Sequence, residues 1–373
     1  MVGFANAAFL PSRSPSRTPR ALEHAPQTWM GTRSLTVARS VSASGGQPTG
    51  TTACATGARI SATASPSGKI CASCPASASA FAWRNANAAV VGSSEPHALL
   101  TRIRLIAKES IIRRMKIREE TISVGGLAVH TWIGGQGDPL LVLHGAGGNR
   151  GFTRSLTQIA ERYTVWAPTH PGFGQSGDAE WMEGVADLAR FHLWFIEAAG
   201  LRRPHLLGAS LGGWTAAEMA AMSPGAIDKL VLVSAAGLKP ERGEILDVFF
   251  HSPAELRELN VYDKTTIPEW DELFGRAPTP AELEIAERNR EMTARLGWKP
   301  YMHNPTLERF LPRVTNRALI VWGREDRIVP VVCGEQYRRL LPNATLTVLD
   351  TCGHLVAIEQ PDTFARIVTE FLA

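Results

Sequence analysis

The stretch 204-PHLLGASLGGW-214 joins an apolar segment to a run of small residues around one serine, Ser210. Its first half is typical of a buried strand, and the residues that follow, 214–222, are typical of a helix. Gly208 and Gly212 flank Ser210 at two residues on either side, which lets the backbone turn sharply without side-chain collisions. The stretch is therefore either an ordinary glycine-rich turn or a G-x-S-x-G elbow that exposes a nucleophilic serine.

Short apolar segments alternate with helical patterns through most of residues 117–373. Strands are expected at residues 139–143, 163–167, 204–209, 229–234, 318–322 and 344–349. Helices are expected at residues 153–162, 183–200, 211–222 and 363–372. A β-hairpin is expected around Gly125 and Gly126. Because these strands are apolar on both sides, they predict an α/β protein with a mainly parallel sheet and helices on both faces.

Residues 238–312 interrupt this alternation with several helical patterns and no strand-like run. Thr279-Pro-Ala-Glu282 is a typical helix start, because it combines a threonine cap, a proline in the first turn and a glutamate three residues after the cap. We expect this all-helical insertion between two core strands to form a lid over the strand ends, at about residues 238–312.

Residues 1–114 differ in composition from the rest of the chain. They are rich in Ala, Ser, Pro, Gly, Thr and Arg, and we expect a disordered, low-complexity extension. Three interpretations stay open: a disordered tail, a leader resembling a transit peptide, or translated upstream sequence before a true start at Met115. The last is favoured because residues 115–373 alone account for one complete domain.

The formal net charge of +4 is unevenly distributed along the chain. Residues 1–114 hold 13 Lys and Arg and three acidic residues, whereas residues 115–373 hold 26 basic and 32 acidic residues. The folded part is therefore mildly acidic, and its charge does not favour nucleic-acid binding. No apolar run reaches the roughly 18 residues that a membrane helix needs, so we expect no membrane partner.

The cysteines give little sign of metal or redox chemistry. Cys71 and Cys74 match the C-x-x-C spacing, but no second pair and no histidine cluster accompany them. Cys333 and Cys352 are expected to be unpaired thiols, which is consistent with a reducing cytoplasm. We therefore expect a cytoplasmic protein. Its expected partner is a small-molecule substrate, and whether it forms a homo-oligomer stays open.

Ser210, Asp326 and His354 follow three different predicted strands, in this order. The carboxyl ends of parallel strands meet at one edge of a sheet, so these three side chains are expected to gather there. A serine hydroxyl is a poor nucleophile unless a neighbouring base takes its proton. His354 would be that base, with Asp326 holding its other ring nitrogen.

Two details of this site are open from the residues alone. Glu325 adjoins Asp326, and Asp350 also lies near a strand end, but the W-G-x-x-D spacing favours Asp326 as the acid. The oxyanion that forms during attack needs preorganised donors, and the backbone N–H groups of Ala146 and Leu211 are the expected pair.

Residues 117–373 resemble the α/β-hydrolase superfamily. The resemblance rests on four motifs in the family's order: 144-HGAGG-148, 208-GASLG-212, 322-WGREDRIVP-330 and 353-GH-354. It implies the α/β-hydrolase fold with a helical lid inserted before the acid-bearing strand. It also implies Ser210 as nucleophile, Asp326 as acid and His354 as base, with no cofactor and no metal.

The substrate pocket is predicted to include His144, Gly145 and Trp298. His144 is expected to brace the oxyanion turn rather than to transfer protons, and His170 is expected to be a loop residue. The other aromatic residues of the insertion that enter this prediction are Phe249, Phe250, Phe274 and Tyr301. We expect a minority of these five aromatic side chains, Trp298 included, to face the cleft.

The leading functional hypothesis is a serine hydrolase that cleaves a small apolar ester or lactone through an acyl-enzyme. The alternative is a carbon–carbon bond hydrolase of aromatic ring-cleavage products, because such enzymes resemble this chain in size, lid position and triad order. They often carry Trp directly after the catalytic His, whereas this chain has Leu355. A third hypothesis is a non-catalytic, ligand-binding member of the fold.

Overall fold

The computed structural model describes residues 115–267 and 269–373 of the chain. The predicted extension at residues 1–114, with Cys71 and Cys74, lies outside the described residues. Cys333 and Cys352 are buried and unpaired, as predicted. In the described part, no helix combines the length and the apolar character needed to cross a lipid bilayer.

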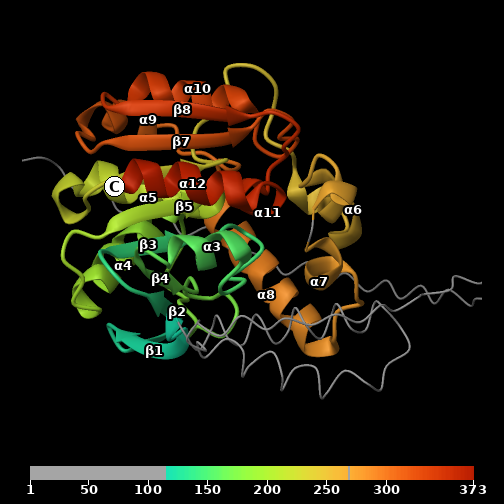
Figure 1. Cartoon of the computed structure of the whole chain (residues 1–373), viewed down its shortest axis with the longest axis horizontal. Coiled ribbons are helices and arrows are strands. Elements are labelled where there is room, and N and C mark those ends of the chain that lie inside the picture. Colours follow the sequence, from blue (N-terminus) through green and yellow to red (C-terminus); the bar gives the residue numbers. More distant parts are fainter. Residues whose placement is uncertain (1–114, 268) are drawn as a thin grey trace, which may run out of the picture. The chain divides into compact units, whose positions relative to one another are not determined.

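An eight-stranded sheet forms the centre of the domain, with the strand order β1-β2-β4-β3-β5-β6-β7-β8 (Figure 1). The strands are β1 (Arg118–Val124), β2 (Leu127–Gly135), β3 (Pro139–Leu143), β4 (Thr164–Pro168), β5 (His205–Ala209), β6 (Leu230–Val233), β7 (Ala318–Gly323) and β8 (Ala344–Leu349). The predicted strands are all present, and their bounds agree with the prediction to within about one residue.

The sheet is mainly parallel, as predicted, with an antiparallel edge. β1 and β2 form the predicted hairpin, in which Val124 pairs with Leu127. Gly125 and Gly126 make its turn with positive φ values of 56° and 85°, which a two-residue hairpin turn of this kind requires. β2 is antiparallel to β4, and the remaining neighbours pair in parallel.

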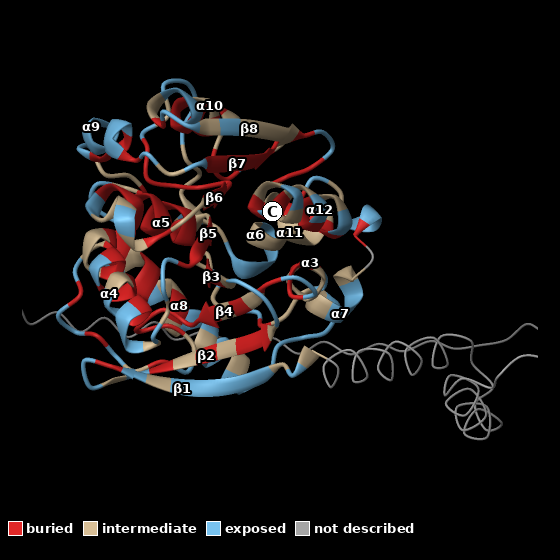
Figure 2. Ribbon diagram, turned by 60° about the vertical axis from the view of Figure 1, so that its left-hand side comes forward, coloured by how far each residue is buried: buried red, intermediate tan, exposed pale blue. Residues whose placement is uncertain are grey.

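Helices cover both faces of the sheet. One face carries α4 (Val185–Ala198), α5 (Leu211–Met222) and α10 (Val331–Leu340), and the other carries α3 (Arg154–Ile159), α11 (Val356–Glu359) and α12 (Pro361–Leu372). A 3₁₀ turn, η1 (Pro224–Ala226), follows α5. Figure 2 shows β7 and much of α5 buried, whereas β1 is exposed at the sheet edge.

Successive residues of the central strands face opposite sides of the sheet. Leu141 and Leu206 belong to the core beneath α4 and α5, whereas Leu140 and Leu207 belong to the core beneath α3 and α12. Because each strand buries both of its faces, a continuous apolar sequence is needed rather than an alternating one. The apolar runs seen in the sequence follow from this two-layer covering.

The segment at residues 238–312 is a helical insertion between β6 and β7. Its elements are η2 (Val248–Phe250), α6 (Pro253–Leu259), η3 (Lys264–Thr266), α7 (Trp270–Phe274), α8 (Pro280–Gly297), α9 (Leu307–Phe310) and η4 (Leu311–Arg313). Thr279 and Glu282 form a complete capping box at the start of α8, as predicted. Figure 1 shows α6, α7 and α8 beside one end of the sheet, and a lid function for them stays a prediction.

The backbone of the β5–α5 unit packs very closely against itself and against β3. A Cβ atom at Gly208 would lie 2.2 Å from the carbonyl oxygen of Gly212, and one at Gly212 would lie 2.2 Å from the carbonyl oxygen of Leu143. Real Cβ atoms do not approach other atoms this closely. Only glycine therefore fits at these two positions without displacement of the backbone.

Gly212→Ala is expected to destabilise the fold by about 1–3 kcal/mol or more, because the added methyl group must push β3 away from α5. Gly225→Ala is the matched control, since a Cβ atom there meets no atom within 4 Å. Urea unfolding followed by circular dichroism measures both variants. An unchanged free energy of unfolding in Gly212→Ala would contradict the close packing described above.

Candidate active site

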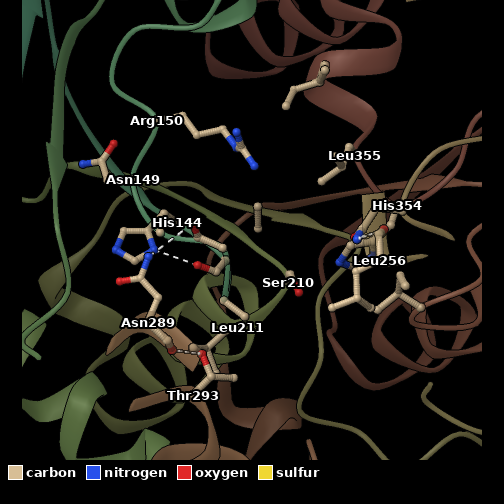
Figure 3. A pocket seen from close by; sticks show the side chains of 18 of the residues that line it. His144, Asn149, Arg150, Ser210, Leu211, Leu256, Asn289, Thr293, His354 and Leu355 are labelled. Atoms are coloured by element: carbon tan, nitrogen blue, oxygen red, sulfur yellow. Dashed lines mark hydrogen bonds between the residues drawn. The ribbon is translucent and has the colours of Figure 1, made fainter. Parts of the chain in front are cut away.

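Ser210 stands between the end of β5 and the start of α5, with φ 54° and ψ −116°. A positive φ costs a non-glycine residue on the order of 1–3 kcal/mol, so surrounding contacts must hold it. The N–H of Ser210 donates to the carbonyl oxygen of Val233 at 2.9 Å, and its carbonyl oxygen accepts the N–H of Ala236 at 3.2 Å. The side chain consequently stands on a sharp turn and lines a cavity (Figure 3).

Asp326 and His354 contact each other directly. Nδ1 of His354 lies 2.8 Å from Oδ2 of Asp326, and the two side chains are 5% and 0% exposed, respectively. Oδ1 of Asp326 accepts the backbone N–H groups of Ile328 and Val329, at 2.9 and 3.0 Å. An ionised carboxylate only accepts hydrogen bonds, so in the neutral imidazole of His354 the proton lies on Nδ1 and Nε2 keeps a lone pair. Such an imidazole can take a proton from a hydroxyl group that reaches Nε2.

The two alternative acids lie elsewhere. Glu325 accepts the backbone N–H of Cys352 at 2.9 Å, and Asp350 is exposed and pairs with Arg324. Ser210 lines the same cavity as His354, although its hydroxyl group has no hydrogen-bond partner among the described residues. Catalytic hydrogen bonds are often long until substrate binds, so this geometry is compatible with proton transfer.

The loop that carries His354 is held from two sides. The carbonyl oxygen of Asn260, at the end of α6, accepts the N–H groups of His354 at 2.8 Å and of Leu355 at 3.2 Å. The buried carboxylate of Glu359 accepts the N–H of Gly353 at 3.0 Å, and desolvation raises its pKa. The position of the imidazole is therefore fixed jointly by the helical insertion and by α11.

The turn after β3 lies against Ser210. A Cβ atom at Gly145 would be 3.1 Å from Cβ of Ser210 and 3.7 Å from its Oγ, so glycine lets the turn approach the hydroxyl group. Ala146 and Leu211 both line the cavity. Leu211 is the first residue of α5, where a backbone N–H has no partner within the helix. The two N–H groups predicted as oxyanion donors thus come from segments that contact Ser210.

Three histidines support this turn. His144 donates its Nδ1–H to the carbonyl oxygen of Gly145 at 2.7 Å, and its Nε2 accepts the backbone N–H of His170 at 2.9 Å. Nε2 of His170 donates to the carbonyl oxygen of His144 at 2.9 Å, and its Nδ1 lies 2.8 Å from Nε2 of His192. These contacts need lone pairs as well as N–H groups, so the network favours neutral rings. His144 therefore braces the turn, and His170 lies within this buried network.

The cavity that contains Ser210 and His354 has a volume of about 720 Å³. This size is typical of a small-molecule site. Its walls come from the ends of the parallel strands and from α6, α7 and α8, and His144 and Gly145 line it as predicted. Most lining side chains are apolar and include Leu156, Leu211, Ile245, Leu256, Ile285 and Ile328.

The prediction for the aromatic residues needs two corrections. Trp298 does not line the cavity: it caps the end of α8, is 53% exposed, and packs edge-on against Phe249 and Tyr301. Phe249, Phe274 and Tyr301 line the cavity, whereas Phe250 is 84% exposed. Three of the five aromatic side chains therefore face the cleft, rather than the expected minority, and Trp298 lies behind two of them.

A family model described as the alpha/beta hydrolase family matches residues 140–367, which is more than half of the chain. The chain belongs to the alpha/beta hydrolase family. This agrees with the sheet order, the Ser210 elbow and the Asp326–His354 contact. It also agrees with the resemblance that the four sequence motifs carry.

Three individual proteins are similar to this α/β hydrolase. The 2-hydroxy-6-oxo-6-phenylhexa-2,4-dienoate hydrolase of Burkholderia cepacia is 31% identical over 281 residues, which cover 68% of this chain and 95% of the relative. A solved hydrolase of the same name from Rhodococcus sp. strain RHA1 is 26% identical with a TM-score of 0.58, and the match covers 69% of this chain and 99% of that one. A bacterial membrane phospholipase A is 27% identical with a TM-score of 0.60, and the match covers 79% and 96%.

Sequence reasoning missed the polar residues that position the site. Asn289 on α8 is buried, its Oδ1 accepts the N–H of Gly174 at 2.9 Å, and its Nδ2 lies 3.4 Å from the carbonyl oxygen of Gly147. One signal could have found it: Asn289 shares a helix face with the apolar residues Met292 and Leu296. No comparable signal marks Asn260, whose contribution comes from its backbone carbonyl group.

The described residues contain no group of three or more His, Cys, Asp or Glu side chains arranged to hold a metal ion. The chemistry that the arrangement itself offers is nucleophilic attack by a hydroxyl group with histidine as general base.

Burial lowers the pKa values of the three histidines beside the turn. Desolvation is the largest cause in each case: the pKa of His144 falls to about 4, that of His192 falls to about 3, and that of His170 falls well below its ordinary value. In the unfolded chain they titrate near the ordinary value of about 6.5. The unfolded chain therefore binds more protons as the pH falls from about 6.5 towards 4, so the stability is full above this range and is lost within it.

Lowering the pH from 7 to 5 should therefore reduce the free energy of unfolding by on the order of 2 kcal/mol for each histidine that stays neutral. His192→Gln keeps a donor for His170 but cannot take up a proton, so its stability should depend less steeply on pH. His251→Gln, at a histidine outside the network, serves as the control. Urea unfolding between pH 5 and 8 measures all three proteins, and equal slopes in wild type and His192→Gln would contradict the neutral network.

Proposed function

We propose that this α/β hydrolase is a serine hydrolase that cleaves a carbon–carbon bond in an aromatic ring-cleavage product. Ser210 is the nucleophile, His354 is the base, and Asp326 orients the imidazole. The 2.8 Å contact between Asp326 and His354, and the strained elbow that carries Ser210 in the same cavity, support this catalytic assignment. The backbone N–H groups of Ala146 and Leu211 are the proposed oxyanion donors.

The similarity to 2-hydroxy-6-oxo-6-phenylhexa-2,4-dienoate hydrolases is the reason for proposing that the cleaved bond is a carbon–carbon bond. It extends over 95% of the Burkholderia cepacia relative at 31% identity, and over 99% of the Rhodococcus structure at 26% identity. This similarity favours carbon–carbon bond hydrolysis over the small ester or lactone that the sequence analysis placed first.

A serine triad can break such a bond when the departing carbon leaves as a stabilised anion. In a 2-hydroxy-6-oxo-dienoate, movement of the hydroxyl proton to C5 gives a ketone at C2 that is conjugated to the C3–C4 double bond. Attack of Ser210 on C6 then allows the C5–C6 bond to break, and its electron pair is delocalised onto the C2 oxygen. The imidazolium of His354 returns a proton to the departing fragment, and water then releases the acid from the acyl-enzyme.

The cavity supports a substrate with a substantial apolar part. Its volume of about 720 Å³ and its largely apolar lining suit an aromatic or alkyl substituent on the scissile carbonyl group. Leu355 lines this cavity at the position where such hydrolases often carry Trp. The smaller side chain leaves more room on the wall beside His354.

Ester hydrolysis is the second candidate function. The similarity to a membrane phospholipase A, at 27% identity and a TM-score of 0.60, supports it together with the apolar lining. Both reactions use the same nucleophile and oxyanion donors, and they differ in whether carbon or oxygen leaves.

A fluorophosphonate probe should label the wild-type protein at Ser210, because an activated hydroxyl group attacks phosphorus. Ser210→Ala should remain unlabelled, and His354→Ala should react at least ~100-fold more slowly, because the base is lost. Ser223→Ala, at the opposite end of α5, is the matched control and should label as the wild type does. Equal labelling of wild type and Ser210→Ala would refute the nucleophile, and an unlabelled wild type would favour a non-catalytic protein.

Wild-type protein should hydrolyse 2-hydroxy-6-oxo-6-phenylhexa-2,4-dienoate with a kcat/KM at least ~10-fold above that for p-nitrophenyl butyrate. Loss of the dienolate absorbance and release of p-nitrophenolate report the two reactions. Ser210→Ala gives the background rate for both substrates. A kcat/KM that is higher for the ester would assign this protein to ester hydrolysis instead.

A further inference from the structure

Arg150 points into the cavity from the segment that follows the oxyanion turn (Figure 3). A Cβ atom at Gly147 would lie 3.9 Å from Nη2 of Arg150, so the guanidinium group lies close to this turn. Its central carbon also stands over the ring of Phe274 on α7, 4.8 Å from the ring centroid. The cation therefore lies between the turn beside Ser210 and a wall formed by the helical insertion.

The guanidinium group of Arg150 lacks an anionic partner. Among the described residues it forms no ion pair and donates no hydrogen bond. It makes a cation–π contact with Phe274. Glu282 lines the same cavity, but it pairs with Arg276. Arg150 is an exposed residue, and desolvation by the neighbouring protein lowers the pKa of its guanidinium group.

The other arginines of the cavity differ from Arg150. Arg276 is paired with Glu282, and Arg290 donates to the carbonyl oxygen of Phe249 at 2.6 Å. Arg257 on α6 forms no ion pair with a described residue either, but nothing links it to the oxyanion turn. Arg150 is therefore the cavity arginine that combines an unpaired guanidinium group with a position next to the reacting groups.

We propose that Arg150 binds the carboxylate of the substrate and makes the protein select acidic over neutral substrates. A guanidinium group can donate two parallel N–H bonds to a carboxylate, and the donors of Arg150 are available for this purpose. Anchoring the carboxylate beside the oxyanion turn would hold the scissile carbonyl group over Ser210. The identity of the acid rests on the proposed function, because the relatives are named for dienoates, whereas the preference for a carboxylate rests on Arg150 itself.

A matched pair of esters tests this preference without any carbon–carbon cleavage. Mono-p-nitrophenyl glutarate carries a free carboxylate, and p-nitrophenyl pentanoate has an acyl chain of equal length without one. In Arg150→Gln, the ratio of kcat/KM for the anionic ester to that for the neutral ester should fall roughly 10- to 100-fold, because a charge-assisted pair is lost. Arg150→Lys should restore part of this ratio, since the charge remains without the planar fork.

Arg154→Gln is the matched control, because Arg154 lies four residues later, is exposed and pairs with Asp362. It should leave the ratio at the wild-type value. An unchanged ratio of kcat/KM values in Arg150→Gln would overturn the proposal. If the ratio falls in Arg257→Gln but not in Arg150→Gln, carboxylate binding belongs to Arg257 on α6 instead.

Equilibrium binding to the Ser210→Ala protein gives a second measurement that needs no turnover. The Kd of 6-phenylhexanoate should rise at least ~10-fold when Arg150→Gln is added, whereas the Kd of the neutral 6-phenylhexanamide should stay the same. Equal effects on both ligands would refute a carboxylate site. If the ester ratio and the binding change as expected while the dienoate is not cleaved, the carbon–carbon hydrolase assignment fails and the role of Arg150 stands.

Discussion

Backbone atoms of β3, β5 and α5 approach each other at Gly208 and Gly212 more closely than a Cβ atom would allow. This packing forces the chain to reverse within one residue, and Ser210 takes the left-handed backbone conformation that results. The same contacts bring the turn after β3 against the hydroxyl group. The nucleophile and the segments that carry both proposed oxyanion donors therefore meet at one closely packed junction.

The base reaches this junction from a separate part of the fold. His354 comes from the loop after β8, and its position depends on the carbonyl oxygen of Asn260 and, through Gly353, on the carboxylate of Glu359. Asn289 of α8 meets the oxyanion turn on the other side. The helical insertion thus contacts both halves of the site, besides forming walls of the cavity.

Much of the fold follows from local sequence. The sheet and the gathering of the candidate catalytic residues can be predicted from three features: the apolar strands, the paired glycines around Ser210, and the order of serine, acid and histidine. They suffice because parallel strands place their carboxyl ends together. The insertion is different. An amphipathic helix pattern shows which residues are buried, but not whether they are buried against a cavity or against another helix, which is why Trp298 was misplaced. The acceptor role of Asn260 involves its backbone, so its side chain carries no information about it. That Arg150 has no ion-pair partner among the described residues becomes known only when its neighbours are known.

The carbonyl group of Asn260 has a consequence for the modularity of this fold. Chimeras of two related hydrolases can be built by exchanging the helices around the cavity, with the aim of transferring substrate preference. Here an exchange that includes the end of α6 would also replace the acceptor for the N–H groups of His354 and Leu355. A successful chimera must therefore preserve the backbone path at Asn260, whatever side chains it brings, because recognition and proton transfer share this support.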